Sequence, residues 1–181
     1  MRYLVVSDIH GDGESADIIN KLNDSLNPDY ILCLGDILYH GPRNDLPKNY
    51  NPKHVIEVLN KLKDKIIAVR GNCEAEVDQM VLDFPCMTTN NTIIFNNRKL
   101  FMSHGHIYSP NNLPTLKEND IFLSGHTHIP TAYQNEDNIY LLNPGSITLP
   151  KENNPRTYAI LEDYNFSIYT IEDILYMSIT L

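Results

Sequence analysis

Seven side chains that can bind metal ions follow directly on short apolar segments of this chain. Each offers a carboxylate oxygen, an amide oxygen or an imidazole nitrogen, a donor set that suits manganese, iron, zinc or cobalt better than copper(I) or an iron–sulfur cluster. Gathered in one place, seven such groups are enough for two divalent ions that share a ligand, and paired ions support in-line displacement at phosphorus. The seven are Asp8, His10, Asp36, Asn72, His104, His126 and His128.

The apolar segments themselves predict buried β-strands. Buried strands have such runs, and we expect strands of one sheet to bring their ends to a common edge. In an extended segment, residues two apart face the same side, so Asp8 should converge with His10, and His126 with His128. Asp36 has two oxygens and could bridge two ions. The segments cover residues 3–7, 30–35, 66–71, 100–103 and 121–125.

The rest of the pattern predicts an α/β chain of one domain, residues 1–181, with two packed sheets and helices outside. The first half alternates strand and helix, whereas the second half is mostly strand. Between them, residues 38–51 form a long loop rich in Pro, Gly and Asn, a type of loop that often carries function. We expect helices at 13–23 and after Asn51-Pro52, a short helix or turn at 74–82, and hairpins pairing 92–95 with 99–103, 132–134 with 139–142, and 157–161 with 166–171.

Composition and charge narrow the classes of partner. The 181 residues are 42% hydrophobic and carry a net charge of −9, which argues against binding to duplex nucleic acid or an anionic membrane. Bound metal ions could still supply positive charge for small phosphorylated substrates. No apolar run approaches membrane-spanning length, and the first residues lack a signal-peptide pattern. The three cysteines are widely spaced and predict neither a disulfide framework nor a thiolate zinc site, so we expect a cytoplasmic protein.

The ordered set of motifs resembles a known family. Asp-x-His, Gly-Asp, Gly-Asn, Gly-His and Gly-His-x-His occur in this order, as they do in the calcineurin-like metallophosphoesterases. The sequence around these motifs is similar to that of the small bacterial, YfcE-like phosphodiesterase subgroup of that family, and the likeness covers nearly the whole chain. The matching stretches are LGDILYHGPRN at 34–44, AVRGNCEAEVDQM at 68–80, SHGHIYSPNNLP at 103–114, SGHTHIP at 124–130 and NPGSITLPK at 143–151.

This resemblance implies a fold, a ligand set and a mechanism. The fold would be a sandwich of two mixed sheets flanked by helices. A hydroxide bridging two metal ions would attack phosphorus, with manganese as the usual activating ion, and Asn72 and His104 would position both metal and substrate. Two divalent ions, two carboxylates and a hydroxide leave a charge of +1, which matches a singly charged phosphodiester. One ion would be held by Asp8, His10, Asp36 and His128, and the other by Asp36, Asn72, His104 and His126.

Cys73 departs from the pattern of many family members, which carry a histidine here to protonate the leaving oxygen. A free thiol titrates near 8.5, so it could donate a proton but lacks the poise of imidazole near neutrality. Three functional alternatives follow. Cys73 acts as a weak general acid, or His40 or water protonates the leaving oxygen instead, or the enzyme prefers substrates with good leaving groups. Alternatively, Cys73 is a small thiol that packs under the site. A subgroup with cysteine here fits phosphodiesterase rather than phosphomonoesterase activity.

Two residues of the long loop are candidates for substrate contacts. The guanidinium of Arg43 could clamp two phosphoryl oxygens, and its alternative is a salt bridge that orders the loop. His40 precedes it in the same loop. His106, two residues after His104, either supports the site from behind or lies on a surface loop.

We therefore predict a metal-dependent phosphodiesterase that acts on small phosphodiester molecules through two divalent ions. Manganese is the first choice, with zinc, iron or cobalt as alternatives. The competing functions are a phosphomonoesterase, a dinucleotide-polyphosphate hydrolase, or a non-catalytic scaffold subunit of the same fold. Exposed sheet edges leave a homo-oligomer open.

Overall fold

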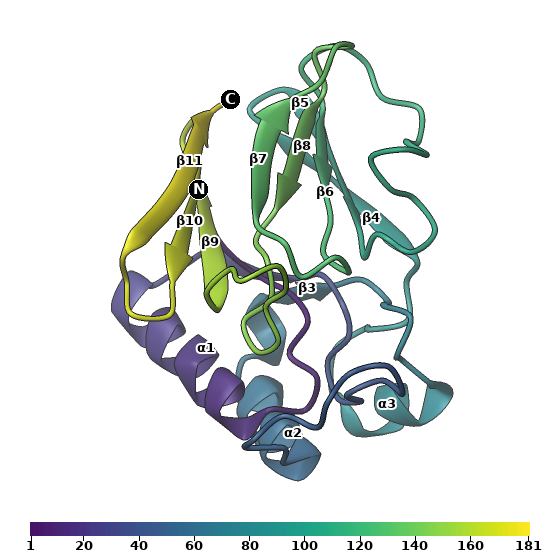
Figure 1. The fold of residues 1–181 in the computed structure, drawn as a ribbon, viewed down its shortest axis with the longest axis vertical. Helices are drawn as coiled ribbons and strands as arrows, with labels where there is room; N and C mark the ends of the chain where they lie inside the picture. Colours follow the sequence, from purple (N-terminus) through teal and green to yellow (C-terminus); the bar gives the residue numbers. More distant parts are fainter.

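Two β-sheets pack face to face, and helices cover the outer side of one of them (Figure 1). The structure is a computed structural model that describes residues 1–181. In the six-stranded sheet, β1, β2 and β3 are parallel, and β9 runs antiparallel to β1. The order across this sheet is β11 (Leu175–Thr180), β10 (Asn165–Thr170), β9 (Thr157–Glu162), β1 (Arg2–Val6), β2 (Tyr30–Cys33) and β3 (Ile66–Ala68).

The second sheet has five strands and is also mixed. Its centre is the parallel set β5, β6 and β8, with an antiparallel strand at each edge. Asn96 and Asn97 form the two-residue turn between β4 and β5, and both have positive φ, as the favoured hairpin turns require. The order across the sheet is β4 (Asn90–Phe95), β5 (Arg98–Ser103), β6 (Ile121–Leu123), β8 (Tyr140–Asn143) and β7 (Thr131–Gln134).

The helices begin and end where local chemistry dictates. The side chain of Asp12 accepts the N–H of Ser15 and caps the first helix, and Asn27, in the left-handed conformation, ends it. Asn51 caps the second helix, which has Pro52 in its first turn. The helices are α1 (Gly13–Leu26), α2 (Pro52–Lys61) and α3 (Glu76–Val81), with a short 3-10 turn at Lys63–Lys65.

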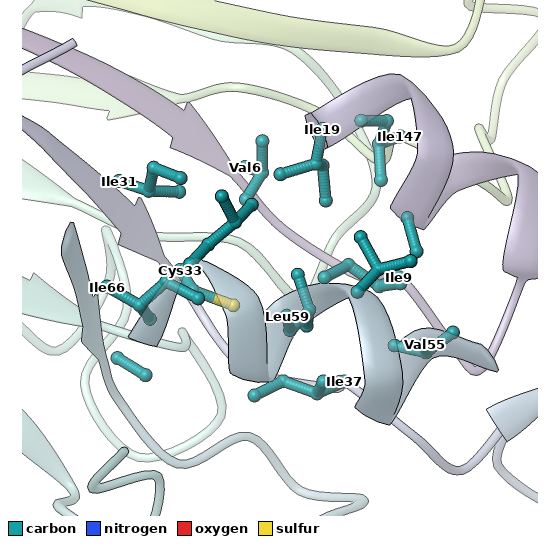
Figure 2. Close-up of a cluster of buried hydrophobic side chains, with 14 of the residues drawn as sticks. Val6, Ile9, Ile19, Ile31, Cys33, Ile37, Val55, Leu59, Ile66 and Ile147 are labelled. Carbon is teal, nitrogen blue, oxygen red and sulfur yellow. The ribbon is translucent and has the colours of Figure 1, made fainter. Parts of the chain in front are cut away.

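Burial of apolar side chains on both faces of the six-stranded sheet holds these layers together. On the outer face, Ile31 and Cys33 pack against Ile19 of α1 and Leu59 of α2 (Figure 2). The inner face packs against the second sheet through a separate cluster. That cluster includes Val5, Leu32, Met102, Leu123 and Phe166. No helix of the structure combines the length and the apolar composition needed to cross a membrane.

The fold confirms the predicted two-sheet sandwich, with three differences. The first helix extends to Leu26, beyond the predicted end. The strand β11 was not predicted, because it is an edge strand whose residues are all exposed or half-buried, so burial does not impose a strong pattern on it. The expectation that the apolar segments share the edge of one sheet was wrong. They divide between the two sheets, as β1, β2 and β3 in one and β5 and β6 in the other.

Candidate metal centre

The candidate ligands lie where the carboxyl ends of these five strands meet, at the seam between the two sheets. Asp8 and His10 follow β1, Asp36 follows β2, and Asn72 follows β3. The other three arrive from the second sheet, His104 after β5 and His126 and His128 after β6. The backbone N–H of His126 donates to Asp8 Oδ2 at 3.1 Å, which joins the two sets directly. The structure thus brings residues more than a hundred positions apart into one cluster.

Left-handed backbone turns, not extended segments, aim these side chains. Five of the seven candidate ligands have positive φ, between 51° and 67°. The expectation that Asp8 and His10 converge because residues two apart in a strand face the same side was therefore wrong in its reason, since the segment is not extended. Non-glycine residues adopt this conformation at a cost of about 1–3 kcal/mol each, and such positions cluster at functional sites. The five are Asp8, His10, Asp36, His126 and His128.

The carboxylate of Asp8 is fully buried, and its two oxygens differ sharply in their partners. Oδ2 accepts the hydroxyl of Ser7 at 2.6 Å and the N–H of His126. Oδ1 has no hydrogen-bond partner, although it lies 3.2 Å from His128 Nε2 and 3.7 Å from His10 Nε2. A buried charged oxygen without a partner is costly, and a bound cation would remove that cost. Asp8 therefore fits a metal ligand.

The imidazoles of His10 and His128 fit the same cation. His10 Nδ1 lies 2.9 Å from the carbonyl oxygen of Tyr39, and His128 Nδ1 contacts that of Leu149. Since a carbonyl only accepts, each Nδ1 carries the hydrogen when the ring is neutral, and each Nε2 then presents a lone pair. The two Nε2 atoms face each other at 3.3 Å. Two lone pairs at this separation repel each other unless a cation or a proton lies between them.

A second group of donors surrounds Asp36. Its Oδ1 accepts the N–H of Cys73 at 2.9 Å. Its Oδ2 lies 3.8 Å from His10 Nε2 on one side and 3.4 Å from His104 Nε2 on the other. One oxygen thus faces both halves of the cluster, which is the placement a bridging ligand needs.

His104 is the centre of the second half of the cluster. Its Nδ1 donates to the Leu34 carbonyl at 2.7 Å, which turns Nε2 inward. That Nε2 lies 3.2 Å from Asn72 Oδ1 and 3.1 Å from His126 Nδ1. His126 therefore presents Nδ1, whereas the other three histidines present Nε2. Exposed His106 stands beside this pair, with its ring centroid 5.4 Å from that of His104.

The charges in the metal-free cluster support one another. Burial alone would raise the pKa of Asp36. The hydrogen bond and the charge of His104 outweigh burial and hold this pKa far below its usual range, so the carboxyl stays ionised. Burial works against protonation of His104 too, yet the hydrogen bond to Asp36 and the charge of Asp8 raise its pKa to about 9. Burial and the charge of His104 lower the pKa of His126 to about 4. These pKa values favour a proton on His104, in the region where a cation would be expected.

Glu74 is a functional candidate that the sequence analysis missed. Its buried carboxylate accepts the N–H of Asp36 at 3.0 Å, that of Ile37 at 2.6 Å and that of Gly71 at 2.5 Å. It thereby holds the Asp36 loop against the Asn72 loop. Burial, followed by the charge of Asp36, raises the pKa of Glu74 to about 7 against the effect of these three donors. An acid directly after Gly-Asn-Cys was the available signal.

A small cleft opens onto the cluster and is lined by Arg43, Cys73 and Lys151. Arg43 is exposed and forms no ion pair, so the alternative role in a loop-ordering salt bridge is not found. Burial and the charge of Asp36 raise the pKa of the Cys73 thiol well above its usual value. His40 is not part of the cleft lining, because its ring packs edge-on between Tyr39 and Tyr50.

Comparison with known proteins agrees with this arrangement. Residues 1–164 match the profile of the calcineurin-like phosphoesterase superfamily domain. The chain is 42% identical to phosphodiesterase YfcE of Escherichia coli over 173 residues, covering 96% of this chain and 94% of that protein.

Solved structures extend the likeness to three dimensions. The structure of the E. coli phosphoesterase YfcE superposes with a TM-score of 0.97 over 99% of both chains, at 39% identity. Vps29 of Entamoeba histolytica, solved with Zn²⁺, is similar in fold, with a TM-score of 0.60 at 19% identity over 99% of each chain. The family implies divalent metal ions, and the Asp and His cluster is present to bind them. By its profile, its close relative and its fold, the chain belongs to the calcineurin-like phosphoesterase superfamily.

Proposed function

We propose that this protein is a phosphodiesterase that hydrolyses small phosphodiesters with two divalent metal ions, manganese being the expected pair. The observation that carries the proposal is the unpartnered Asp8 Oδ1 beneath the facing Nε2 atoms of His10 and His128. One proton can join at most two of these three atoms, whereas one cation can bind all three. The relative with 42% identity is named a phosphodiesterase, which supports the choice of reaction.

The geometry supports a division of the ligands into two sets with Asp36 in both. Asp36 Oδ2 lies within 4 Å of His10 Nε2 and His104 Nε2, one from each set. Two bound ions would lower the pKa of water toward neutrality and neutralise charge on the phosphoryl oxygens. The first set is Asp8, His10, Asp36 and His128, and the second is Asp36, Asn72, His104 and His126.

The chain's own residues would bind and orient the phosphate. Arg43 and Lys151 both line the cleft, so their cationic side chains can approach the non-bridging oxygens of the phosphate. The Asn72 amide can position the second ion and the substrate together, since its Oδ1 already lies 3.2 Å from His104 Nε2. These roles are positional and require no proton transfer from Arg43, Lys151 or Asn72.

Cys73 bears on the choice between mono- and diesters. A thiol whose pKa is raised by burial and by Asp36 stays protonated at neutral pH and releases its proton reluctantly. We therefore assign it no strong role as a general acid. Such a site favours esters whose leaving oxygen needs little help, as in activated aryl phosphodiesters, and it favours diesters over monoesters.

The test is hydrolysis of bis(p-nitrophenyl) phosphate by metal-stripped protein to which single metals are returned. We expect the highest turnover with Mn²⁺, lower turnover of p-nitrophenyl phosphate, and loss of activity in the Asp36→Ala and His128→Ala variants with the fold retained by circular dichroism. His54→Ala is the matched control, because His54 lies on α2 and pairs only with exposed Asp17. Retained activity in Asp36→Ala, or equal activity without metal, would refute the proposal.

A further inference from the structure

A second hollow lies directly beside the candidate metal centre. It is a groove of about 430 Å³ between the 38–51 loop, the start of α2 and the outer side of α3. This volume is within the range of pockets that bind small molecules. The lining is mostly apolar and includes two aromatic rings. The lining residues used below are Tyr39, Tyr50, Ile56, Cys73, Val77 and Val81.

The groove and the polar cleft meet at Cys73, which lines both. Its backbone N–H donates to Asp36 Oδ1, so the residue is fixed at the edge of the metal centre. Its thiol packs close to Gly41, where an added Cβ would lie 3.1 Å from the sulfur. Cys73 has a small side chain, whereas the larger imidazole expected here in many relatives would extend further into the space between the two hollows.

The two hollows have opposite polarity. The cleft is lined by Arg43 and Lys151 as well as by candidate metal ligands. The one ionisable carboxylate of the groove belongs to Asp78, which is buried and accepts the N–H of Ala75 at 3.0 Å. The groove therefore offers no cation to a second phosphate. Adjacent hollows of opposite polarity suit a molecule that carries an anion at one point and an apolar group next to it.

We propose that this groove is a substrate subsite for an apolar, ring-sized ester group of the phosphodiester, with Cys73 at the junction between the phosphate and that group. The inference rests on the proposed function and narrows it to diesters with at least one aryl or similarly apolar ester group. Val77 is 58% exposed and Val81 39%, so apolar surface is available for the ligand to cover. Covering it would favour binding in proportion to the area removed from water.

The test compares two competitive inhibitors that share one phosphate and one charge, dimethyl phosphate and diphenyl phosphate, in the Mn²⁺-loaded enzyme. We expect diphenyl phosphate to have an inhibition constant at least about tenfold lower. Val77→Asp, which puts a charge into the groove, should reduce this preference to about threefold or less. Val77→Ser removes apolar area without adding charge, so its preference for diphenyl phosphate should lie between those of the wild type and Val77→Asp. Met80→Asp is the matched control, since Met80 is on the same helix, is 82% exposed and does not line the groove.

A second readout does not depend on turnover. In protein loaded with diamagnetic Zn²⁺ in place of paramagnetic Mn²⁺, diphenyl phosphate should shift the methyl NMR signals of Ile56 and Val81 through ring currents, and dimethyl phosphate should not. Turnover of diesters with equal inhibition constants and unshifted methyl signals would overturn the subsite and leave the proposed function standing. Shifted methyl signals without turnover under any metal would overturn the proposed function instead. If Val77→Asp changes the oligomeric state by light scattering and not the inhibitor preference, the groove is an interface between copies of the chain and the subsite is wrong.

Discussion

The carboxylate of Glu74 accepts the backbone N–H of Asp36 at 3.0 Å, although the two residues are 38 positions apart in the sequence. The same carboxylate accepts N–H groups from Ile37 and Gly71. Three donors from two loops thus depend on one side chain that presents no atom to the cleft lining. The loops are those that deliver Asp36 and Asn72, so the acid couples stability to the geometry of the candidate metal centre.

Glu74→Gln should lower both the stability of the fold and the affinity of the candidate metal centre for its ions. A glutamine offers one acceptor oxygen in place of two, so at least one buried N–H loses its partner, and we expect the free energy of unfolding to fall by about 1–3 kcal/mol. Affinity for Mn²⁺ should fall as well, because Asp36 and Asn72 lose their common anchor. Urea unfolding and calorimetric titration measure the two effects. Glu76→Gln, an exposed acid two residues away, is the control, and equal behaviour of the two variants would contradict this role.

Metal ions should stabilise the protein by mass action. An ion that binds only the folded chain adds about 2.7 kcal/mol at a concentration a hundred times its dissociation constant. We expect EDTA to lower the melting temperature and Mn²⁺ to restore it, because binding relieves the unpartnered Asp8 Oδ1. In the presence of Mn²⁺, the melting temperature of Asp8→Asn should lie closer to that of the metal-stripped wild type than to that of the Mn²⁺-loaded wild type. A thermal shift series in Mn²⁺ measures this, and no response in the wild type would argue against a metal site.

Metal binding should release protons near neutral pH. In the metal-free protein, Asp36 and Asp8 raise the pKa of His104 to about 9, above the ordinary 6.5. The charged imidazole therefore contributes stability that is fully present below pH 6.5 and is lost as the pH rises through 9. Because Mn²⁺ needs the neutral ring, binding at pH 7.5 should release about one proton from His104, in addition to protons lost from metal-bound water, and the contribution of His104 should be smaller at pH 10. Calorimetry in buffers of different ionisation enthalpy counts the protons, and a release that is the same at both pH values would contradict the assignment to His104.

The thiols should be unreactive while the chain is folded. Cys33 and Cys86 are buried, and burial raises the pKa of each to about 12, so little thiolate forms at pH 8. Cys73 is half-buried, and its pKa is raised as well, so it should react first but slowly. Titration with Ellman's reagent should find three thiols in urea and none that reacts rapidly in the native protein. A thiol that reacts at once in the native protein would show that one of these sites opens in solution.

The fold and the types of ligand were predictable from the sequence because both leave local signals. Apolar segments ending in Asp8, Asp36 and His104 identify strand ends, and alternation marks the hairpins of the second half. The family resemblance and the two-sheet sandwich are confirmed. The assignment of individual ligands to two ions stays a prediction, although the side chains lie together.

Other features left no local signal. The left-handed turns at His126 and His128 occur at non-glycine residues, for which positive φ is uncommon overall, so spacing alone suggested extended segments instead. The edge strand β11 lacks a buried face, and the apolar groove exists only because the 38–51 loop folds against α3, far along the chain. Glu74 was missed because an acid next to a ligand can as easily be exposed, and only tertiary structure shows which N–H groups it accepts.

Three of the inward-facing imidazoles are anchored through Nδ1 to main-chain carbonyls, at Leu34, Tyr39 and Leu149. A carbonyl is present whatever side chain occupies its position. Mutations at Tyr39 and Leu149, which are not fully buried, can therefore change the surface around the site without changing the tautomer of the rings that they anchor. Proteins that share these main-chain anchors can therefore change their preference among esters through substitutions in the loops, because the histidines stay oriented for metal binding.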